Sequence, residues 1–425
     1  MRLFASAGMA YSLTVFTTIF LAALAAATGT RLWLAFRQMR HVHAHRADVP
    51  GMFADSIPLD AHQKAADYTV AKTRLAIVDA VLDAVILLAL TLGGVLQWLS
   101  ELWARVFAIE SIWHGTALIL TVFLLRGLIG LPLSLYRIFV IEERFGFNRM
   151  TWKLFLTDLV KGLAVGAVLG VPLLLVVLWL MLAAGPLWWL YVWLVIVVYS
   201  LVLQMIYPAV IMPLFNKFSP LEDPALAGRI ERLLERTGFR SRGLYVMDGS
   251  KRSSHGNAFF AGFGAAKRIV LFDTLVSRLQ PAEVEAVLAH ELGHYKLKHI
   301  VKGMALSWGF SFVLLLALGL LAGQPWFHQG LGVSTGTLPV TLLLFMLVVP
   351  EFTFFVQPLL SLFSRKNEYE ADRYAAANAD ARDLVQALVK LYKDNSATLT
   401  PDPLHSAYYD SHPPAAMRIA RLRTV

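Results

Sequence analysis

Two histidines four residues apart, with a glutamate directly after the first, are the residues of this sequence best suited to metal chemistry. They are His290, Glu291 and His294, in the stretch EAVLAHELGHYKLKH. On a helix, residues four apart share a face, so both imidazoles can bind one zinc ion at about 2.0–2.1 Å. The glutamate can then take a proton from a water at the metal. In a chain with 12 histidines, an HExxH pattern arises by chance with a probability on the order of one in a hundred, so the motif indicates a metallopeptidase but needs support.

A catalytic zinc ion usually takes three protein ligands and keeps one open position, so this chain needs a ligand beyond the two histidines. The metzincin pattern would place a glycine and a histidine where this chain has Leu297 and Ile300, so that class is excluded. His299 lies five residues beyond His294 and, on a continuous helix, points away from it. The third ligand must therefore come from another element.

The segment NEYEAD, residues 367–372, is the best candidate for that element. Glu368 and Asp372 lie one turn apart on the same helical face, whereas Glu370 points roughly 200° away. One carboxylate can bind the metal while a second accepts a hydrogen bond from the far nitrogen of a ligand histidine. The alternative is the solvated, charged start of a helix, which is the commoner meaning of such a segment taken alone.

The composition is that of an integral membrane protein. Of the 425 residues, 57% are hydrophobic and 16% are charged, whereas an average soluble domain has roughly 25% charged residues. The chain has no cysteine, which excludes disulfides, thiolate metal ligands and a cysteine nucleophile, so any metal must be bound by His, Asp or Glu. The net charge of +9 comes without the basic patches interleaved with aromatic residues that nucleic-acid binding needs. We therefore expect a lipid bilayer as a partner and no nucleic acid.

Seven apolar segments are long enough to cross a membrane, for which about 20 residues are needed. They lie at residues 9–34, 75–98, 114–138, 155–184, 186–213, 304–323 and 338–363. Lysine and arginine are concentrated in loops one and three, and the loops on the other side carry few or none. This bias predicts that loops one, three and five and the C-terminus lie in the cytoplasm. The two histidines lie in loop five, so the catalytic site is expected to face the cytoplasm, at a bacterial inner membrane or the endoplasmic reticulum depending on the source.

The predicted organisation has four parts. Residues 1–213 hold five transmembrane helices, and residues 214–303 form a small water-facing catalytic domain with α and β elements. Residues 304–363 hold transmembrane helices six and seven. Residues 364–425 form a second water-facing helix, broken near Asn378, and a C-terminal tail.

Local signals define the elements of the water-facing domain. Asp223 as N-cap and Gly238 as stop bound a helix, and GLYVMD, NAFFAGFG and KRIVLFD have the composition of strands. Pro281 opens the helix that carries the two histidines. That helix is expected to continue past Lys302 into the sixth span.

Several segments, occurring in the same order along the chain, resemble those of one known protein family. ERFGFNRMTWKLFLTDLVKG, PLFNKFSPL, RSSHGNAFFAGFGAAKRIVLFDTLV, SRKNEYEADRYA and SAYYDSHPP, taken with HELGH, resemble the type I CAAX prenyl protease family of seven-span membrane zinc endopeptidases. The resemblance implies one Zn²⁺ per chain held by His290, His294 and Glu368, with Glu291 as catalytic base. It also implies a mainly α membrane protein whose seven helices enclose a water-filled chamber, with a zincin-like domain on the cytoplasmic side. The charged residues within the predicted spans agree with a wet interior, since such groups line water or pair with one another. They are Asp79, Asp83, Arg126 and Glu351.

The same resemblance suggests roles for residues that carry little signal alone. Asn257 and Ala258 open a strand to which a substrate peptide can add, although an asparagine there can also simply cap a turn. His412 in the tail is expected to donate a hydrogen bond to the oxyanion. Arg418 is expected either to pair with a carboxylate of the site or to help hold that oxyanion, while Asp372 supports a ligand histidine.

The motif thus predicts a membrane-embedded zinc endopeptidase, and the resemblance implies that it removes C-terminal residues from prenylated or similar peptides. A general quality-control metalloprotease without a lipid requirement is the alternative within the same chemistry. A transporter would need internal repeats or paired broken helices, and neither is found in the sequence. An inactive scaffold is disfavoured by the intact HExxH motif and its matching glutamate.

Overall fold

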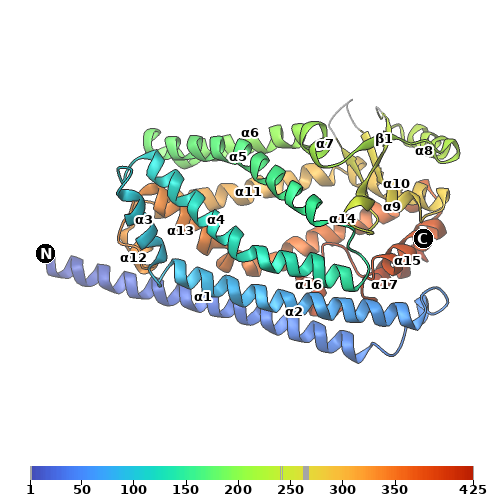
Figure 1. The fold of residues 1–425 in the computed structure, drawn as a ribbon, viewed down its shortest axis with the longest axis horizontal. Coiled ribbons are helices and arrows are strands. Elements are labelled where there is room, and N and C mark those ends of the chain that lie inside the picture. The colour runs from blue at the N-terminus through green and yellow to red at the C-terminus, as the bar shows by residue number, and fades with distance from the viewer. Residues whose placement is uncertain (1, 240, 242, 262–267, 425) are drawn as a thin grey trace.

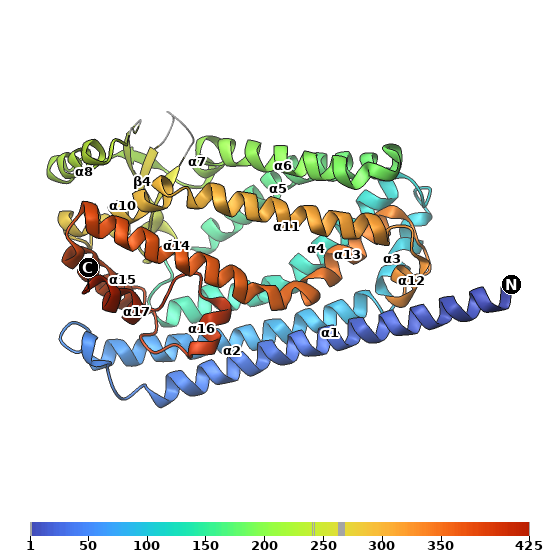
Figure 2. The same cartoon turned by 180° about the vertical axis from the view of Figure 1, so that it is seen from behind.

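The computed structural model describes residues 2–239, 241, 243–261 and 268–424. Long helices run along the long axis of the molecule, and a small sheet with several shorter helices is gathered at one end (Figures 1 and 2). The opposite end carries two short helices close to the N-terminus. The prediction of a mainly α membrane protein with a small α+β part is confirmed.

Membrane-type helices make up most of the described chain. Six helical runs are long and apolar enough to cross a membrane, and a seventh span is obtained when one bent pair is counted as a single span. The helices in these runs are α1 (Arg2–Ala44), α2 (Leu59–Leu90), α3 (Val95–Ala104), α4 (Ile112–Tyr136), η2 (Arg137–Glu142), α5 (Trp152–Ala183), η3 (Gly185–Leu187), α6 (Trp188–Ile206), η4 (Tyr207–Ile211), α7 (Met212–Phe215), α11 (His299–Leu321), α13 (Leu338–Thr353), η7 (Phe354–Val356) and α14 (Gln357–Asn378).

The second predicted span is not one straight helix. The chain bends by 51° between α2 and α3, inside the range 75–98 that the sequence predicts as a single segment. Gly94 adopts φ +77° at this point, a left-handed conformation that glycine tolerates without a steric penalty. The adjacent glycines 93 and 94 therefore turn the chain where hydropathy alone predicts that it continues.

Four charged side chains within the membrane region form two ion pairs. Arg31 contacts Glu351 at 2.7 Å, and Arg126 contacts Asp83 at 3.0 Å. All four line a cavity of about 170 Å³ between α1, α2, α4 and α13. Pairing across helices lowers the cost of placing ionised groups at membrane depth.

The end of the molecule that holds the small sheet also holds the histidine motif and is called the catalytic end below. Its sheet has four strands in the order β1-β2-β4-β3. Its strands are β1 (Phe218–Pro220), β2 (Leu244–Met247), β3 (Ala258–Ala261) and β4 (Arg268–Phe272). β2 and β4 are parallel, whereas β1 with β2 and β3 with β4 are antiparallel, so β3 lies at one edge. Three strands match the predicted ones, and β1 is additional. The last part of the predicted third strand, residues 262–264, lies outside the described residues.

Shorter helices surround this sheet and the ends of the long helices. They are η1 (Gly51–Phe53), α8 (Pro224–Thr237), η5 (Gly249–Lys251), α9 (Asp273–Val276), α10 (Pro281–Lys296), α12 (Pro325–Gly330), α15 (Ala381–Asp394), α16 (Pro403–Tyr409) and α17 (Ala415–Leu422). The predicted limits of α8 are confirmed, because Asp223 accepts hydrogen bonds from the first helical amides and Gly238 is left-handed. The predicted break near Asn378 is confirmed as well, since α14 ends there and Asp380 caps α15.

The prediction of one continuous helix from Pro281 through Lys302 is wrong. α10 ends at Lys296, and α11 begins at His299 after a short break. Lys298 has φ +59°, a left-handed conformation that is uncommon for a residue with a side chain. Leu297 and Lys298 thus separate the helix that carries the histidine motif from the membrane helix.

Candidate metal centre and active site

α10 is held in place by its apolar face and its N-terminal cap. Leu288 and Leu292 are fully buried in the core of the catalytic end. At the start of the helix, the backbone N–H of Gln280 donates to the Glu283 carboxylate at 2.7 Å, which satisfies a group that the helix itself leaves unpaired. The opposite face of α10, which carries the two histidines, is thereby presented to α14.

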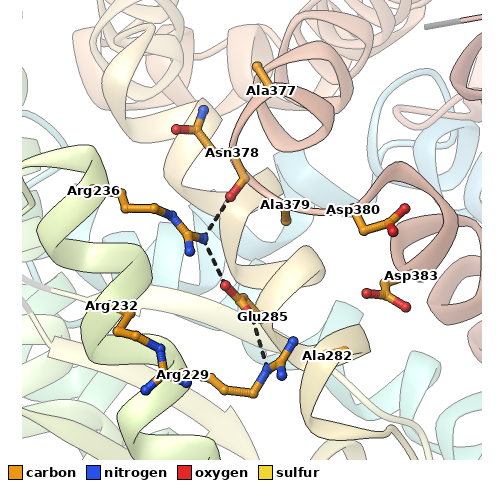
Figure 3. A pocket seen from close by; sticks show the side chains of 10 residues that line it. All are labelled: Arg229, Arg232, Arg236, Ala282, Glu285, Ala377, Asn378, Ala379, Asp380 and Asp383. Carbon is orange, nitrogen blue, oxygen red and sulfur yellow. Dashed lines mark hydrogen bonds and ion pairs between the residues drawn. The ribbon is translucent and has the colours of Figure 1, made fainter.

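Glu285 fastens α10 to α8 (Figure 3). Its carboxylate accepts hydrogen bonds from Arg229 at 2.9 Å and from Arg236 at 2.8 Å. Arg236 also donates to the backbone oxygen of Asn378, the last residue of α14, at 2.8 Å. One arginine therefore joins all three helices beside a pocket of about 400 Å³.

Gly293 allows α10 and α14 to approach closely. A Cβ atom at this position would lie 2.9 Å from Cα of Ala371 and 3.1 Å from Cβ of Tyr374. Ordinary contacts between carbon atoms are about 3.5–4.0 Å, so only glycine fits without a shift of the helices. The glycine within HELGH thus sets the distance between the helix that carries the histidines and the helix that carries NEYEAD.

This close approach brings His290, His294 and Glu368 to a common point. The two Nε2 atoms are 3.1 Å apart, and the carboxylate lies 3.5 Å from His290 Nε2 and 3.2 Å from His294 Nε2. Ligand atoms around a tetrahedral zinc ion at about 2.0–2.1 Å are about 3.3 Å apart, so the observed spacing fits a single ion. Oε2 of Glu368 is buried and accepts no hydrogen bond from the described residues, and its nearest cation, Nη1 of Arg418, is 3.5 Å away, so a bound metal would supply the missing partner.

Asp372 supports the first histidine from behind. Nδ1–H of His290 donates to Asp372 at 2.9 Å, which fixes the tautomer with Nε2 free to bind a metal. Asp372 in turn accepts two hydrogen bonds from Arg418, at 2.9 and 2.6 Å. All three side chains are buried. Of the two roles predicted for Arg418, its geometry matches pairing with a carboxylate.

The prediction that His299 points away from His294 is wrong, whereas Glu370 lies on another face of the continuous helix α14 than Glu368, as predicted, and contacts His299. Nδ1 of His299 is 3.0 Å from Nδ1 of His294, and Nε2 of His299 is 3.1 Å from Glu370. The reason is the break at Lys298, which redirects the chain so that His299 returns beneath His294. No glycine, asparagine or proline marks this break in the sequence.

Glu291 follows the first histidine, is half-buried, and lies near enough to His290, His294 and Glu368 to interact with their charges. Burial raises the pKa of its carboxyl above the ordinary value, although the neighbouring His290 and His294 oppose the shift. A glutamate beside the metal ligands can accept a proton from a water bound at the metal position.

His412 reaches the same site from the tail. Its Nε2 atom lies 3.4 Å from Oε1 of Glu368, while 63% of its side chain is exposed. The tail segment is anchored before this residue by Asp402, which binds Arg37 of α1 at 2.9 Å and caps α16. The exposed imidazole can therefore meet a group that enters from solvent.

Asn257 and Ala258 lie where the edge strand begins. Oδ1 of Asn257 accepts a hydrogen bond from the backbone N–H of Ala258 at 2.8 Å. This contact matches the alternative given above, in which the asparagine caps a turn. The Asn257 side chain is exposed, and its Nδ2 group has no acceptor among the described residues. The outer edge of β3 thus offers backbone groups and one side-chain amide.

Each half of the chain matches a known protein family. Residues 38–217 match the family described as CAAX prenyl protease N-terminal, five membrane helices. Residues 220–425 match peptidase family M48, so the second match contains every residue of the metal centre.

Similar proteins cover most of the chain. CAAX prenyl protease 1 homolog of Arabidopsis thaliana is 34% identical, over 87% of this chain and 89% of its own length. CAAX prenyl protease 1 of Saccharomyces cerevisiae is 39% identical, over 70% of this chain and 69% of its own. The crystal structure of S. mikatae Ste24p superposes with a TM-score of 0.90 at 32% identity, covering 96% of this chain and 98% of that one.

Proposed function

This chain belongs to the CAAX prenyl protease family within peptidase family M48, and on that premise we propose that it is a zinc endopeptidase acting on prenylated peptides or proteins. The observation that carries the proposal is that His290, His294 and Glu368 meet at one point between α10 and α14. These two helices can approach so closely because residue 293 is a glycine. The donor set of two imidazoles and one carboxylate suits zinc in a catalytic site.

Zinc bound there would act as a Lewis acid that polarises the scissile carbonyl and activates a water. Glu291 takes the proton of the attacking water and delivers it to the leaving amine. His412 donates a hydrogen bond to the carbonyl oxygen as negative charge develops on it. Asp372 and Arg418 keep His290 in its ligand tautomer throughout the reaction.

The substrate peptide adds to the outer edge of β3, beginning at Asn257 and Ala258. Backbone hydrogen bonds along an edge strand hold a peptide in an extended form without requiring a particular sequence. The Nδ2 group of Asn257 supplies a further donor to the peptide backbone. An extended peptide on this edge is aligned for cleavage at the metal.

The catalytic end faces the cytoplasm in this proposal, because lysine and arginine are concentrated in the loops assigned to that side. The lipid group of a prenylated substrate is accommodated on the membrane side, within a chamber enclosed by the spans. The paired charges Arg31–Glu351 and Arg126–Asp83 support a polar interior. The products are a shortened prenylated chain and the released C-terminal residues.

Cleavage of one fluorogenic peptide in farnesylated and unmodified forms tests the proposal. The purified protein in detergent is compared with Glu291→Gln, which controls for contaminating peptidases. Cleavage of the farnesylated peptide alone is the expected result. Equal cleavage of both forms would replace the prenyl-specific function with general quality-control proteolysis.

A further inference from the structure

We propose that His299 is a positioning residue that holds the zinc ligand His294 through a hydrogen-bonded chain ending at Glu370. The inference rests on the proposed zinc peptidase function and adds His299 and Glu370, neither of which is among the three metal ligands. Its observations are the two contacts of His299, at 3.0 Å to His294 and at 3.1 Å to Glu370.

The direction of each hydrogen bond follows from the chemistry of imidazole. His294 points Nε2 at the metal position, so its proton is carried on Nδ1. That N–H must donate to Nδ1 of His299, which therefore has no proton of its own. His299 then carries its proton on Nε2 and donates it to the Glu370 carboxylate. Only one arrangement of protons satisfies the whole chain.

The surroundings keep this arrangement in place. The His299 side chain is only 4% exposed, so water cannot readily replace either partner. Lys302 lies 3.8 Å and Lys366 3.9 Å from Glu370, so two positive charges face the carboxylate that ends the chain. Residue 299 reaches this position because Lys298 adopts a left-handed conformation that ends α10 and starts α11.

The two ligand histidines are thus supported in different ways. His290 donates directly to Asp372, whose second partner is Arg418. His294 donates to the imidazole of His299, and the carboxylate of Glu370 is reached only through that second histidine. An outer partner that fixes ring orientation typically contributes a ten- to hundredfold factor in metal affinity. We expect a factor of that size for His299.

Zinc release from the purified full-length protein tests this role without any substrate. The rate is followed with a chromogenic chelator for wild type, His299→Leu and His299→Asn. Leucine fills a similar volume without polar atoms, whereas Oδ1 of asparagine lies close to the position of Nδ1. We expect release from His299→Leu to be about ten- to a hundredfold faster, and most of this loss to be recovered in His299→Asn.

Glu370→Ala is measured alone and combined with His299→Leu. If the residues act as one chain, Glu370→Ala should speed release in the wild-type background and have no further effect beside His299→Leu. Equal release rates for wild type and His299→Leu would overturn the proposal. Equally fast release from the leucine and asparagine variants would overturn it too, because packing rather than the hydrogen bond would then explain the effect.

Failure of the proposed function gives a different result. Wild type that binds zinc with the expected dependence on His299, but cuts neither form of the fluorogenic peptide, would contradict the function and keep the positioning role. Wild type that binds no zinc would overturn both.

Discussion

Replacing Gly293 with alanine tests whether the distance between two helices controls the metal centre. The added Cβ would lie 2.9 Å from Cα of Ala371, where about 3.5–4.0 Å is needed. Cα is backbone and cannot rotate away, so α10 and α14 must separate by about 0.6–1 Å. His290 and His294 lie on one of these helices and Glu368 on the other.

The size of this shift decides the outcome. Ligand distances in a zinc site tolerate about ±0.2 Å, which is several times smaller than the required separation. Overpacking also costs roughly 1–3 kcal/mol, offset by about 1 kcal/mol from the better helix propensity of alanine. The net loss of fold stability is therefore modest, and we expect the main effect to be at least tenfold weaker zinc binding with a matching loss of turnover.

The matched control is Gly303→Ala. Gly303 lies in α11, where a Cβ would meet nothing within 4 Å, so the substitution should keep zinc and activity. Zinc affinity is measured by chelator competition, and turnover is measured with the fluorogenic peptide. If Gly293→Ala binds zinc as tightly as Gly303→Ala, the close approach of the helices does not set the site and the reasoning is refuted.

Three further substitutions separate the chemical roles. Glu291→Gln should keep zinc and abolish turnover, because an amide cannot take the water proton; appreciable cleavage by a clean preparation would exclude the base role. Arg418→Ala should destabilise the protein by roughly 3–5 kcal/mol, because it removes the only arginine that pairs with the buried Asp372 carboxylate among the described residues and leaves that charge with His290 alone; an unchanged melting temperature in detergent would contradict this. His412→Ala should lower kcat roughly 10²–10³-fold with zinc content unchanged; a change confined to KM would point to substrate binding instead.

Local chemistry made several parts of this structure predictable. Asp223 and Gly238 bound α8 because a cap and a left-handed stop depend on only a few neighbouring residues. The face shared by His290 and His294, and that shared by Glu368 and Asp372, follow from helical periodicity. These short-range rules do not require knowledge of how the helices pack.

The parts that were not predictable depend on packing. Lysine is not a residue type that favours a left-handed conformation, so the left-handed Lys298 that follows α10 is imposed by the tertiary structure. Without that break, the position of His299 and its contact with Glu370 cannot be deduced. The Arg418–Asp372 pair joins residues 46 apart, and only the likeness of the tail to a known family drew attention to it. The bend near Gly94 is different, since two adjacent glycines give a local signal that a hydropathy window averages out.

The metal centre depends on membrane helices at three separate points. His294 is supported by His299, the first residue of the membrane helix α11, and Glu368 lies on a helical run that begins in the membrane at Leu338. His412 follows a tail segment that Asp402 ties to α1. Each of the three groups would lose its anchor if the spans moved relative to one another. The peptidase chemistry is therefore a property of the whole membrane protein, because its water-facing part alone does not fix the ligand, its support and the tail in one geometry.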